Sequence, residues 1–363
     1  MRLRRLWLTD FRGYSTAGVS FAPGLTAVLG ANGQGKTNLL EAVGYLATLG
    51  SFRGAPVEAL IRAGAERAVV RGEAERDGRE LLLEAELAGG GRNRASVNRQ
   101  PLRRARDLLG ALRVTVFSPD DLALVKAGPS ERRRYLDDAL VALHPRNDGV
   151  RADLDRVLRQ RNALLKQAGG RSSPEVEVTL DVWDVKLAAT GEALAAARRS
   201  LLSELVPALG IAYTEVAQRD VALEAVYAPA WAAMDGGLAG ALAAGRREDL
   251  RRGLSLVGPH RDELELRIAG LPARTHASQG EQRSLALALR LAAHRVVAAA
   301  TGTPPVLLLD DVFSELDPER SHALLAHLPP GQTILSTAGP LPPGADPDHT
   351  IAVHDGTATE PGS

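Results

Sequence analysis

Apolar positions change their spacing along the chain and divide it into three parts. Alternating or continuous apolar residues predict strands toward both ends. These patterns cover residues 68–98, 114–117, 264–268, 306–309 and 333–337. From Asp120 the apolar residues recur at helical spacing, and one long helix is predicted over Val178–Val206, closed by Pro207. We therefore predict an α/β domain built from residues 1–118 and 251–363, with a mostly helical insertion over 119–250.

The composition narrows the possible chemistry. The 363 residues carry equal numbers of cationic and acidic side chains, so no overall basic charge indicates a nucleic-acid partner, although a local basic face is still allowed. No cysteine occurs, which excludes disulfides, thiolate metal sites and a cysteine nucleophile. The sequence shows neither a signal-peptide pattern nor an apolar run long enough to span a membrane. We expect a soluble, cytoplasmic protein without a membrane partner.

The strongest motif follows the apolar run Leu25–Leu29. It has the G-x-x-x-x-G-K-T spacing of a phosphate-binding loop between a strand and a helix. The residues are Gly30, Ala31, Asn32, Gly33, Gln34, Gly35, Lys36, Thr37 and Asn38. Backbone N–H groups and the helix N-terminus can surround phosphates. We expect Lys36 to reach the β- and γ-phosphates of ATP and the Thr37 hydroxyl to bind Mg²⁺. The alternative, a glycine turn without a ligand, explains the flanking elements less well.

Two acids end the apolar run 306–309. Ligands bind at the carboxyl ends of parallel strands, so Asp310 is expected beside the phosphate loop, holding Mg²⁺ directly or through water. Asp311 is expected to orient or deprotonate the attacking water. The alternative is that both acids only cap a turn. The presence of the phosphate loop favours the magnesium role.

A helix start at Ser278 allows two interpretations. Ser278 and Glu281 have the spacing of a capping box, which would make the segment a well-capped helix and nothing more. The same helix start could offer a hydroxyl and free N–H groups to a phosphate, including one bound by a second copy of the chain. The spacing alone does not choose between them.

Basic residues gather in a stretch that contains no acid. Residues 92–106 hold Arg92, Arg94, Arg99, Arg103, Arg104 and Arg106. A second group, Arg132–Arg134, follows. Such residues can neutralise DNA phosphates without reading the base sequence. The alternative is a solvated arginine-rich face, and the local sequence favours DNA contact only slightly.

Taken together, these motifs resemble the RecF family, bacterial recombination-repair ATPases of the SMC and ABC-type superfamily. The resemblance is carried by residues 11–14, 30–38, 119–122, 128–134, 257–262, 278–282 and 310–317, in one consistent order. The phosphate loop is widely shared among proteins. The Val257–Asp262 and Asp310–Asp317 segments are much more particular to this family.

The resemblance implies an ABC-type P-loop ATPase head with an inserted helical domain and no long coiled coil. It implies a homodimer that forms with ATP, in which the loop of one copy and the signature of the other enclose each nucleotide. The signature residues expected at the nucleotide are Ser278, Gly280 and Gln282. Asp317 would lie in the loop that contacts the other subunit, and Arg12 near the phosphates.

Two departures from the wider ABC pattern concern hydrolysis. Asp311 stands where many relatives have glutamate, and its carboxylate is one methylene shorter, which favours slow hydrolysis. Residues 335–338 lack the switch histidine of many transport ATPases, and no switch glutamine can be assigned after Phe117. The residue that senses the γ-phosphate is therefore not identified by the sequence.

The functional expectation is DNA replication and recombinational repair after DNA damage, including the SOS response. The resemblance implies a slow, DNA-stimulated ATPase used as a switch. It would bind single-stranded, double-stranded or gapped DNA and help RecR and RecO to load RecA. One competing class is an ABC-type transport ATPase subunit, disfavoured by the large insertion and the missing histidine. An SMC-type structural DNA tether would need a long coiled coil, and a small-molecule kinase would not explain residues 278–282.

Overall fold

The computed structural model describes residues 1–360 and divides the chain into two compact units. Unit 1 comprises Met1–Leu122, Ala208–Asp220 and Arg283–Ser363. Unit 2 comprises Ala123–Pro207 and Val221–Gln282. The boundary after Leu122 lies close to the predicted boundary after residue 118. The units differ from the predicted domains in two segments. Residues 208–220 belong to unit 1, and residues 251–282 belong to unit 2.

Unit 1 contains two six-stranded sheets with helix α1 (Lys36–Thr48) between them. The first sheet is antiparallel and has the order β2-β1-β4-β5-β6-β7. Its strands are β1 (Arg2–Phe11), β2 (Tyr14–Ser20), β4 (Arg67–Arg76), β5 (Arg79–Ala88), β6 (Arg94–Val97) and β7 (Gln100–Pro101). Alternate residues of these strands are buried, so one face packs on α1 and the other is open.

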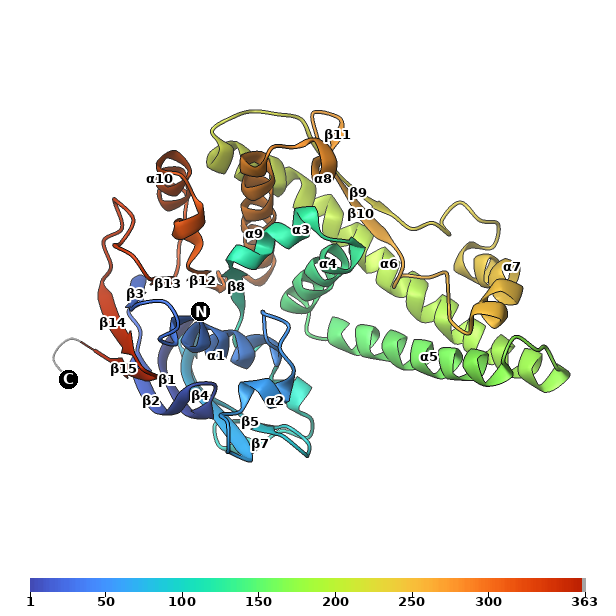
Figure 1. Cartoon of the computed structure of the whole chain (residues 1–363), viewed down its shortest axis with the longest axis horizontal. Coiled ribbons are helices and arrows are strands. Elements are labelled where there is room, and N and C mark those ends of the chain that lie inside the picture. The colour runs from blue at the N-terminus through green and yellow to red at the C-terminus, as the bar shows by residue number, and fades with distance from the viewer. Residues whose placement is uncertain (361–363) are drawn as a thin grey trace. The chain divides into compact units, whose positions relative to one another are not determined.

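The second sheet joins the two ends of the chain. Its order is β15-β14-β3-β13-β12-β8, and all neighbours pair in parallel except β15 with β14. Its strands are β3 (Leu25–Leu29), β8 (Val114–Phe117), β12 (Val306–Asp310), β13 (Thr333–Thr337), β14 (His349–His354) and β15 (Thr357–Thr359). The N-terminal strand β3 lies between the C-terminal strands β13 and β14 (Figure 1). The predicted α/β domain from both chain ends is confirmed.

The remaining helices of unit 1 are short, apart from α9. They are α2 (Val57–Leu60) and α10 (Pro318–Ala326), with the 3₁₀ turns η1 (Ala105–Leu108), η2 (Pro119–Leu122) and η3 (Val312–Glu315). Helix α9 (Gln279–Thr301) begins in unit 2 and continues in unit 1. Within residues 1–360 only α9 is long and apolar enough to cross a membrane. Since 61% of its apolar window is buried inside the protein, α9 has the character of a core helix.

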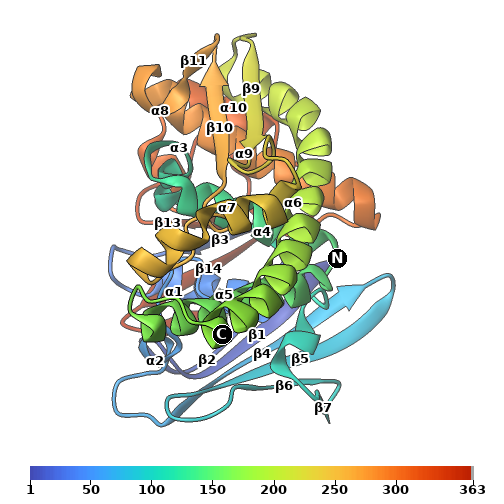
Figure 2. The same ribbon diagram turned by 90° about the vertical axis from the view of Figure 1, so that its right-hand side faces the viewer.

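Unit 2 is mostly helical, as predicted, but it also holds a small sheet. Its helices are α3 (Ala123–Lys126), α4 (Pro129–Leu143), α5 (Asn147–Ala168), α6 (Pro174–Ala217), α7 (Gly237–Arg252) and α8 (Ala273–His276). Strands β9 (Leu223–Ala228), β10 (Glu263–Ile268) and β11 (Leu271–Pro272) form an antiparallel sheet that lies beside α6 (Figure 2). Pairing of β10 with β9 explains why the segment 251–282 stays in unit 2.

Helix α6 corrects the prediction that Pro207 closes a helix. The helix runs through Pro207 to Ala217, and its last ten residues belong to unit 1. Proline inside a helix costs about 3 kcal/mol through the lost N–H and the ring clash. Beyond Pro207 the helix buries Leu209, Ala212, Tyr213 and Val216 almost completely. Burial of two large side chains and two smaller ones is worth more than that cost, so packing overrides the local signal.

Candidate functional site

The phosphate loop is held by both ends of the chain. At Gly30, with φ +157°, a Cβ atom would lie 2.3 Å from the Val353 carbonyl oxygen of β14, so only glycine fits there. The side-chain oxygen of Gln34 accepts a hydrogen bond from the Asp355 N–H at 2.6 Å. The backbone carbonyl of Gln34 accepts one from the Gly356 N–H at 3.2 Å. The C-terminal hairpin therefore fixes the backbone that would surround phosphates.

Lys36 and Thr37 begin α1 at the end of this loop. The Lys36 ammonium is 6% exposed and donates to the Ala31 carbonyl oxygen at 2.9 Å, so it lies back across the loop. The Thr37 hydroxyl donates to an Asp310 carboxylate oxygen at 2.9 Å, although 273 residues separate the two in the sequence. This contact places the end of β12 directly beside the loop, where Asp310 was predicted.

Ser336 links the two acids at the end of β12. Its hydroxyl donates to Asp310 at 2.7 Å and accepts from the Asp311 N–H at 3.1 Å. Asp311 has a left-handed backbone with φ +50°, and its Oδ1 atom is buried without a hydrogen-bond partner. A buried, unpaired carboxylate oxygen next to the loop is unusual outside functional sites. Sequence reasoning noted Ser336 only for the missing histidine, and missed its role in orienting both acids.

The electrostatics of Asp310 suit a cation ligand. Burial raises the pKa of Asp310, and the Ser336 and Thr37 hydroxyls oppose that rise by hydrogen bonding to the charged form. Mg²⁺ prefers oxygen ligands and normally takes only one or two from protein, completing its shell with phosphates and water. The Thr37 hydroxyl and the Asp310 carboxylate fit that role. In residues 1–360 no cluster of three His, Asp or Glu side chains could hold an ion alone.

Arg12, which is expected near the phosphates, pairs with a carboxylate of α1. Its guanidinium bonds to both carboxylate oxygens of Glu41 at 2.7 and 2.8 Å and donates to the Ala59 carbonyl at 2.9 Å. Glu41 is fully buried on α1 and also accepts from the Ser51 hydroxyl. Arg12 therefore braces α1 through Glu41, and its contact with the phosphates stays a prediction.

The loop after α1 supplies a residue that sequence reasoning missed. Ser51 is tied to Glu41, and the Phe52 ring lies against Gly44, where a Cβ atom would be 3.2 Å away. The next residue, Arg53, is exposed, and its charge lies close enough to lower the pKa of Asp310. Arg53 is therefore a second cation near the acidic end of the site. Nothing in its local sequence marked it, because only the fold brings it near β12.

The signature segment is a capping box in unit 2. The Ser278 N–H and hydroxyl both lie 2.8 Å from a Glu281 carboxylate oxygen, and the Glu281 N–H donates back at 3.3 Å. Ser278 is exposed and Gly280 is partly exposed. Gln282 is buried, and its amide donates to the carbonyls of Ala273 and Arg274 at 3.0 and 3.1 Å. This placement makes Gln282 a support for α8, and its expected nucleotide contact stays a prediction.

Asp317 caps helix α10. Its side chain accepts from the Arg320 N–H at 2.9 Å, and Pro318 occupies the first helical position. The cap is exposed at the surface of unit 1. It leaves Asp317 free to lie in a loop that meets another subunit, which stays a prediction.

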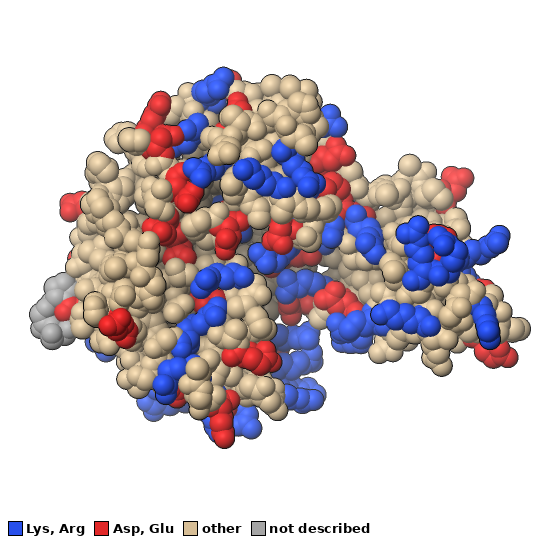
Figure 3. All heavy atoms as spheres, viewed as in Figure 1, with Lys and Arg blue, Asp and Glu red and all other residues tan. Residues whose placement is uncertain are grey.

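The predicted DNA-contact arginines divide into accessible and inaccessible ones. Five are exposed, namely Arg92, Arg94, Arg99, Arg103 and Arg104, and Arg106 is partly exposed. Lys and Arg side chains gather at the lower edge of the view in Figure 3, over strands β5 and β7. Arg132 is different, since it is buried, pairs with Glu263 and donates to the carbonyls of Leu124 and Ala127. Arg132 is therefore not available to DNA.

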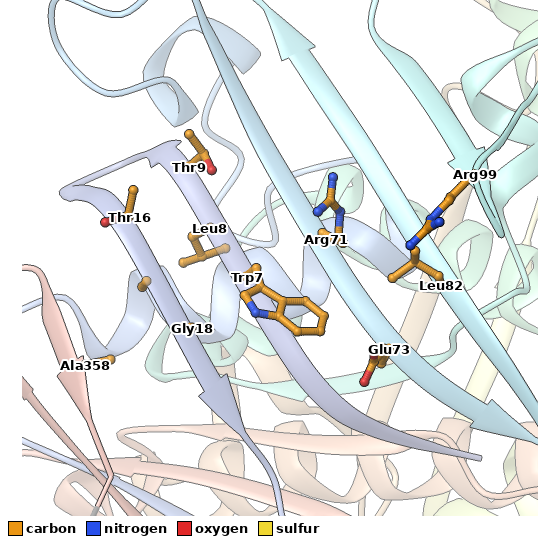
Figure 4. A pocket seen from close by; sticks show the side chains of 11 residues that line it. Trp7, Leu8, Thr9, Thr16, Gly18, Arg71, Glu73, Leu82, Arg99 and Ala358 are labelled. Atoms are coloured by element: carbon orange, nitrogen blue, oxygen red, sulfur yellow. The ribbon is translucent and has the colours of Figure 1, made fainter. Parts of the chain in front are cut away.

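A hollow of about 710 Å³ lies on the open face of the antiparallel sheet, away from α1 (Figure 4). Trp7 lies at its centre, with Arg71, Arg99 and Glu73 around it. A smaller hollow beside it adds Arg94. Three acids, Glu73, Glu84 and Glu86, offset these arginines. The hollow is therefore lined by charges of both signs, and no residue of the phosphate loop lines it.

Comparisons with known proteins cover nearly the whole chain. The family model described as RecF/RecN/SMC N terminal domain matches residues 2–333. The DNA replication and repair protein RecF of Kineococcus radiotolerans is 46% identical over 381 residues, covering 98% of this chain and 97% of that protein. RecF of Streptomyces avermitilis is 47% identical over 93% of both chains. A solved structure of the recombination mediator protein RecF-ATP in the RecFOR pathway has a TM-score of 0.90 and 30% identity, covering 99% of this chain and 97% of that chain.

Proposed function

This chain belongs to the RecF family, and from that premise we propose that it is an ATP-dependent DNA-binding protein of replication and recombinational repair. Nucleotide binding would set whether the protein is engaged on DNA, and hydrolysis would reset it. The observation that carries this proposal is the 2.9 Å contact between the Thr37 hydroxyl and Asp310. It joins the phosphate loop to the acidic strand end, which is the arrangement that a nucleotide-dependent switch needs.

The residues of this site have separate tasks in binding. The loop N–H groups and the α1 N-terminus would surround the phosphates, and the Lys36 ammonium would leave Ala31 to neutralise the β- and γ-phosphates. Thr37 and Asp310 would hold Mg²⁺, which supplies charge neutralisation of the phosphates when bound. The Ser336 hydroxyl, which donates to Asp310 at 2.7 Å, would keep that carboxylate in place when Mg²⁺ is bound.

Hydrolysis would depend on Asp311. Its left-handed backbone and its two bonds to Ser336, at 3.1 and 3.2 Å, fix the carboxylate beside the site. Its buried, unpaired Oδ1 atom is the acceptor that an attacking water could use. Because aspartate reaches one methylene less far than glutamate, turnover would be slow, and DNA binding would accelerate it by completing the site.

A second copy of the chain would complete the nucleotide site. The exposed Ser278 at the start of α9 offers a hydroxyl and free N–H groups, which suit a γ-phosphate held by the partner. Each homodimer would then enclose two nucleotides, and Asp317 would lie in the loop that meets the other copy. ATP-bound dimers would be the form that holds DNA.

The cellular role follows from the family. The chain would act in the cytoplasm, bind single-stranded, double-stranded or gapped DNA, and help RecR and RecO to load RecA. The exposed arginines between Arg92 and Arg104 supply a surface for phosphates. Neither alternative class gains support. Membership of the RecF family argues against a transport subunit, and residues 1–360 form no long coiled coil for a tether.

A DNA titration with and without ATP tests this proposal. Double-stranded and gapped DNA would be titrated with the protein alone, with ATP and Mg²⁺, and with a non-hydrolysable analogue. We expect tight binding only with nucleotide. Lys36→Met should lose both ATP binding and the nucleotide effect on DNA, because the charge that neutralises the phosphates is gone. If the parent protein binds DNA with the same affinity with and without nucleotide, the proposed nucleotide-dependent switch is wrong.

A further inference from the structure

Two segments that mark the family, Gly128–Arg134 and Val257–Asp262, have no task in the nucleotide chemistry. The structure brings them together in unit 2. Arg132 donates to both carboxylate oxygens of Glu263, at 2.8 and 2.9 Å. Arg133 donates to the carbonyl oxygen of Asp262 at 2.8 Å. We call this contact between the start of α4 and the start of β10 the arginine junction, comprising Arg132, Arg133, Arg261, Asp262 and Glu263.

Every carboxylate around the arginine junction already has a partner. Glu263 is held by Arg132. Asp262 accepts from the Tyr227 hydroxyl and from the Trp231 indole N–H at 3.0 Å. Asp137 accepts two bonds of 2.8 Å from Arg198. The charges of these three carboxylates also act on Arg133, whereas Arg261 has no ion pair within residues 1–360.

Arg261 is the outward-facing member of the junction. Its side chain is exposed, and within residues 1–360 it makes no hydrogen bond or ion pair. Its backbone is nonetheless fixed, because its N–H donates to the Gly258 carbonyl at 2.8 Å and His260 bonds to the Ser255 carbonyl at 3.0 Å. The side chain therefore projects from a loop that needs little further ordering to bind a ligand.

Arg133 lies among charges of both signs. Burial and the charge of Arg198 lower the pKa of Arg133, and the charges of Glu263, Asp262 and Asp137 oppose that shift. Burial lowers the pKa of His260, against the hydrogen bond to Ser255, with smaller effects from Arg261 and Arg133. Arg261 is therefore the exposed positive charge of the junction that no carboxylate within residues 1–360 pairs with.

We propose that Arg133 and Arg261 bind the phosphate backbone of double-stranded DNA. This inference rests on the proposed function, since it assigns part of the DNA contact to unit 2. One exposed and one half-buried cation, without a cage of donors to recognise one small anion, suit a polymer that gains affinity from many separate contacts. The buried pairs behind them hold the two arginines in place.

The test compares DNA affinity over a range of salt concentrations, using the full chain with a non-hydrolysable ATP analogue. Arg261→Gln is the main variant, because no intramolecular contact of its side chain is lost. Arg133→Gln is the second variant. Arg261→Lys keeps the charge. Arg251→Gln is the matched control, since Arg251 is an exposed arginine of unit 2 that already pairs with Glu248 at the surface. Analogue affinity and the thermal midpoint are measured for each protein.

We expect Arg261→Gln to weaken DNA binding about fivefold to tenfold at 0.1 M salt and to reduce the salt slope by about one. Arg261→Lys should restore the slope, and analogue affinity should stay at the parent value in all variants. An unchanged slope in Arg261→Gln and Arg133→Gln would overturn the inference, as would an equal loss in Arg251→Gln. If the parent fails to bind DNA with the analogue, the proposed function falls together with this inference.

Discussion

Two loops of this protein carry sequence motifs of the family and use their polar groups in different ways. In unit 1 the phosphate loop and the acids beside it leave polar groups partly unsatisfied, with Lys36 bonded to a carbonyl and a buried Asp311 oxygen unpaired. In unit 2 the Val257–Asp262 loop is anchored by the buried Arg198, and its own carboxylate, Asp262, is fully engaged. The first loop keeps groups available for a ligand, whereas the buried groups of the second hold helices together and only its exposed Arg261 side chain faces outward.

The comparison shows that a family motif need not mark chemistry. Arg161 is fully buried in unit 2 and bonds to Asp184 at 2.6 Å, to Asp249 at 2.7 Å and to the Ser255 hydroxyl at 2.9 Å. It joins α5, α6 and α7 to Ser255, two residues before the loop. Arg198 does the same for α4 and α6 by donating to Asp137 and to the Pro259 carbonyl. Within residues 1–360, only Arg133 and Arg261 among the arginines of the junction form no ion pair, so a binding role is confined to them.

The largest expected effect tests whether buried arginines stabilise unit 2. Arg161→Leu leaves Asp249 buried without its main counter-charge, and we expect the free energy of unfolding to fall by about 3–5 kcal/mol. Denaturant unfolding followed by tryptophan fluorescence measures it, since Trp183 and Trp231 both report on unit 2. Arg251→Leu removes an exposed ion pair and should leave stability nearly unchanged. Equal effects in the two variants would contradict the buried role of Arg161.

The next effect tests whether Asp311 beside the phosphate loop takes part in ATP hydrolysis. Asp311→Asn keeps the shape of the side chain and removes its basicity, so ATP and Mg²⁺ binding should persist while turnover falls about 10²-fold or more. Dimers should then be long-lived in ATP. Single-turnover hydrolysis and nucleotide titration measure the two effects separately. Normal turnover would show that Asp311 is not the general base.

A smaller effect concerns a buried polar group of unit 1 outside the nucleotide site. His294 on α9 contacts the Thr115 hydroxyl at 3.0 Å, and burial lowers its pKa to about 4. Unfolded histidine titrates near pH 6.5, so the unfolded state binds the proton first as the pH falls. We expect the stability due to neutral His294 to be lost between about pH 6.5 and 4, on the order of 3 kcal/mol. His294→Gln should flatten that part of the profile, and an unchanged slope would contradict it.

The sequence was sufficient to predict those elements in which the local apolar pattern and the chemically active residues indicate the same structure. Local sequence patterns predicted the strand before Gly30, helix α1 and the acidic end of β12. The geometry of a parallel sheet then predicted that Thr37 and Asp310 lie side by side. The continuation of α6 through Pro207 was not readable, because it depends on burial of Leu209 and Tyr213 in the other unit.

Other parts of the site depend on partners distant in the sequence. The Arg12 guanidinium, expected near the phosphates, bonds to the buried Glu41, which lies 29 residues away in the sequence. The Gln282 amide, expected at the nucleotide, bonds to two carbonyls of α8. Ser336 and Arg53 gain their importance only through contacts with Asp310 that span many residues. A pattern identifies the residue types of a site, whereas the tertiary contacts decide which of them are free.

The signature serine gives the most direct test of the central claim, that each nucleotide site is completed by a second copy. Ser278→Arg removes a cap and places a cation at a helix start, costs of roughly 1 and 0.3–1 kcal/mol that a chain of this size should survive. Sedimentation with a non-hydrolysable ATP analogue is the measurement. We predict normal analogue binding by the monomer, with dimerisation and ATPase activity both lost. Normal dimers would leave Ser278 as a helix cap only and contradict the account.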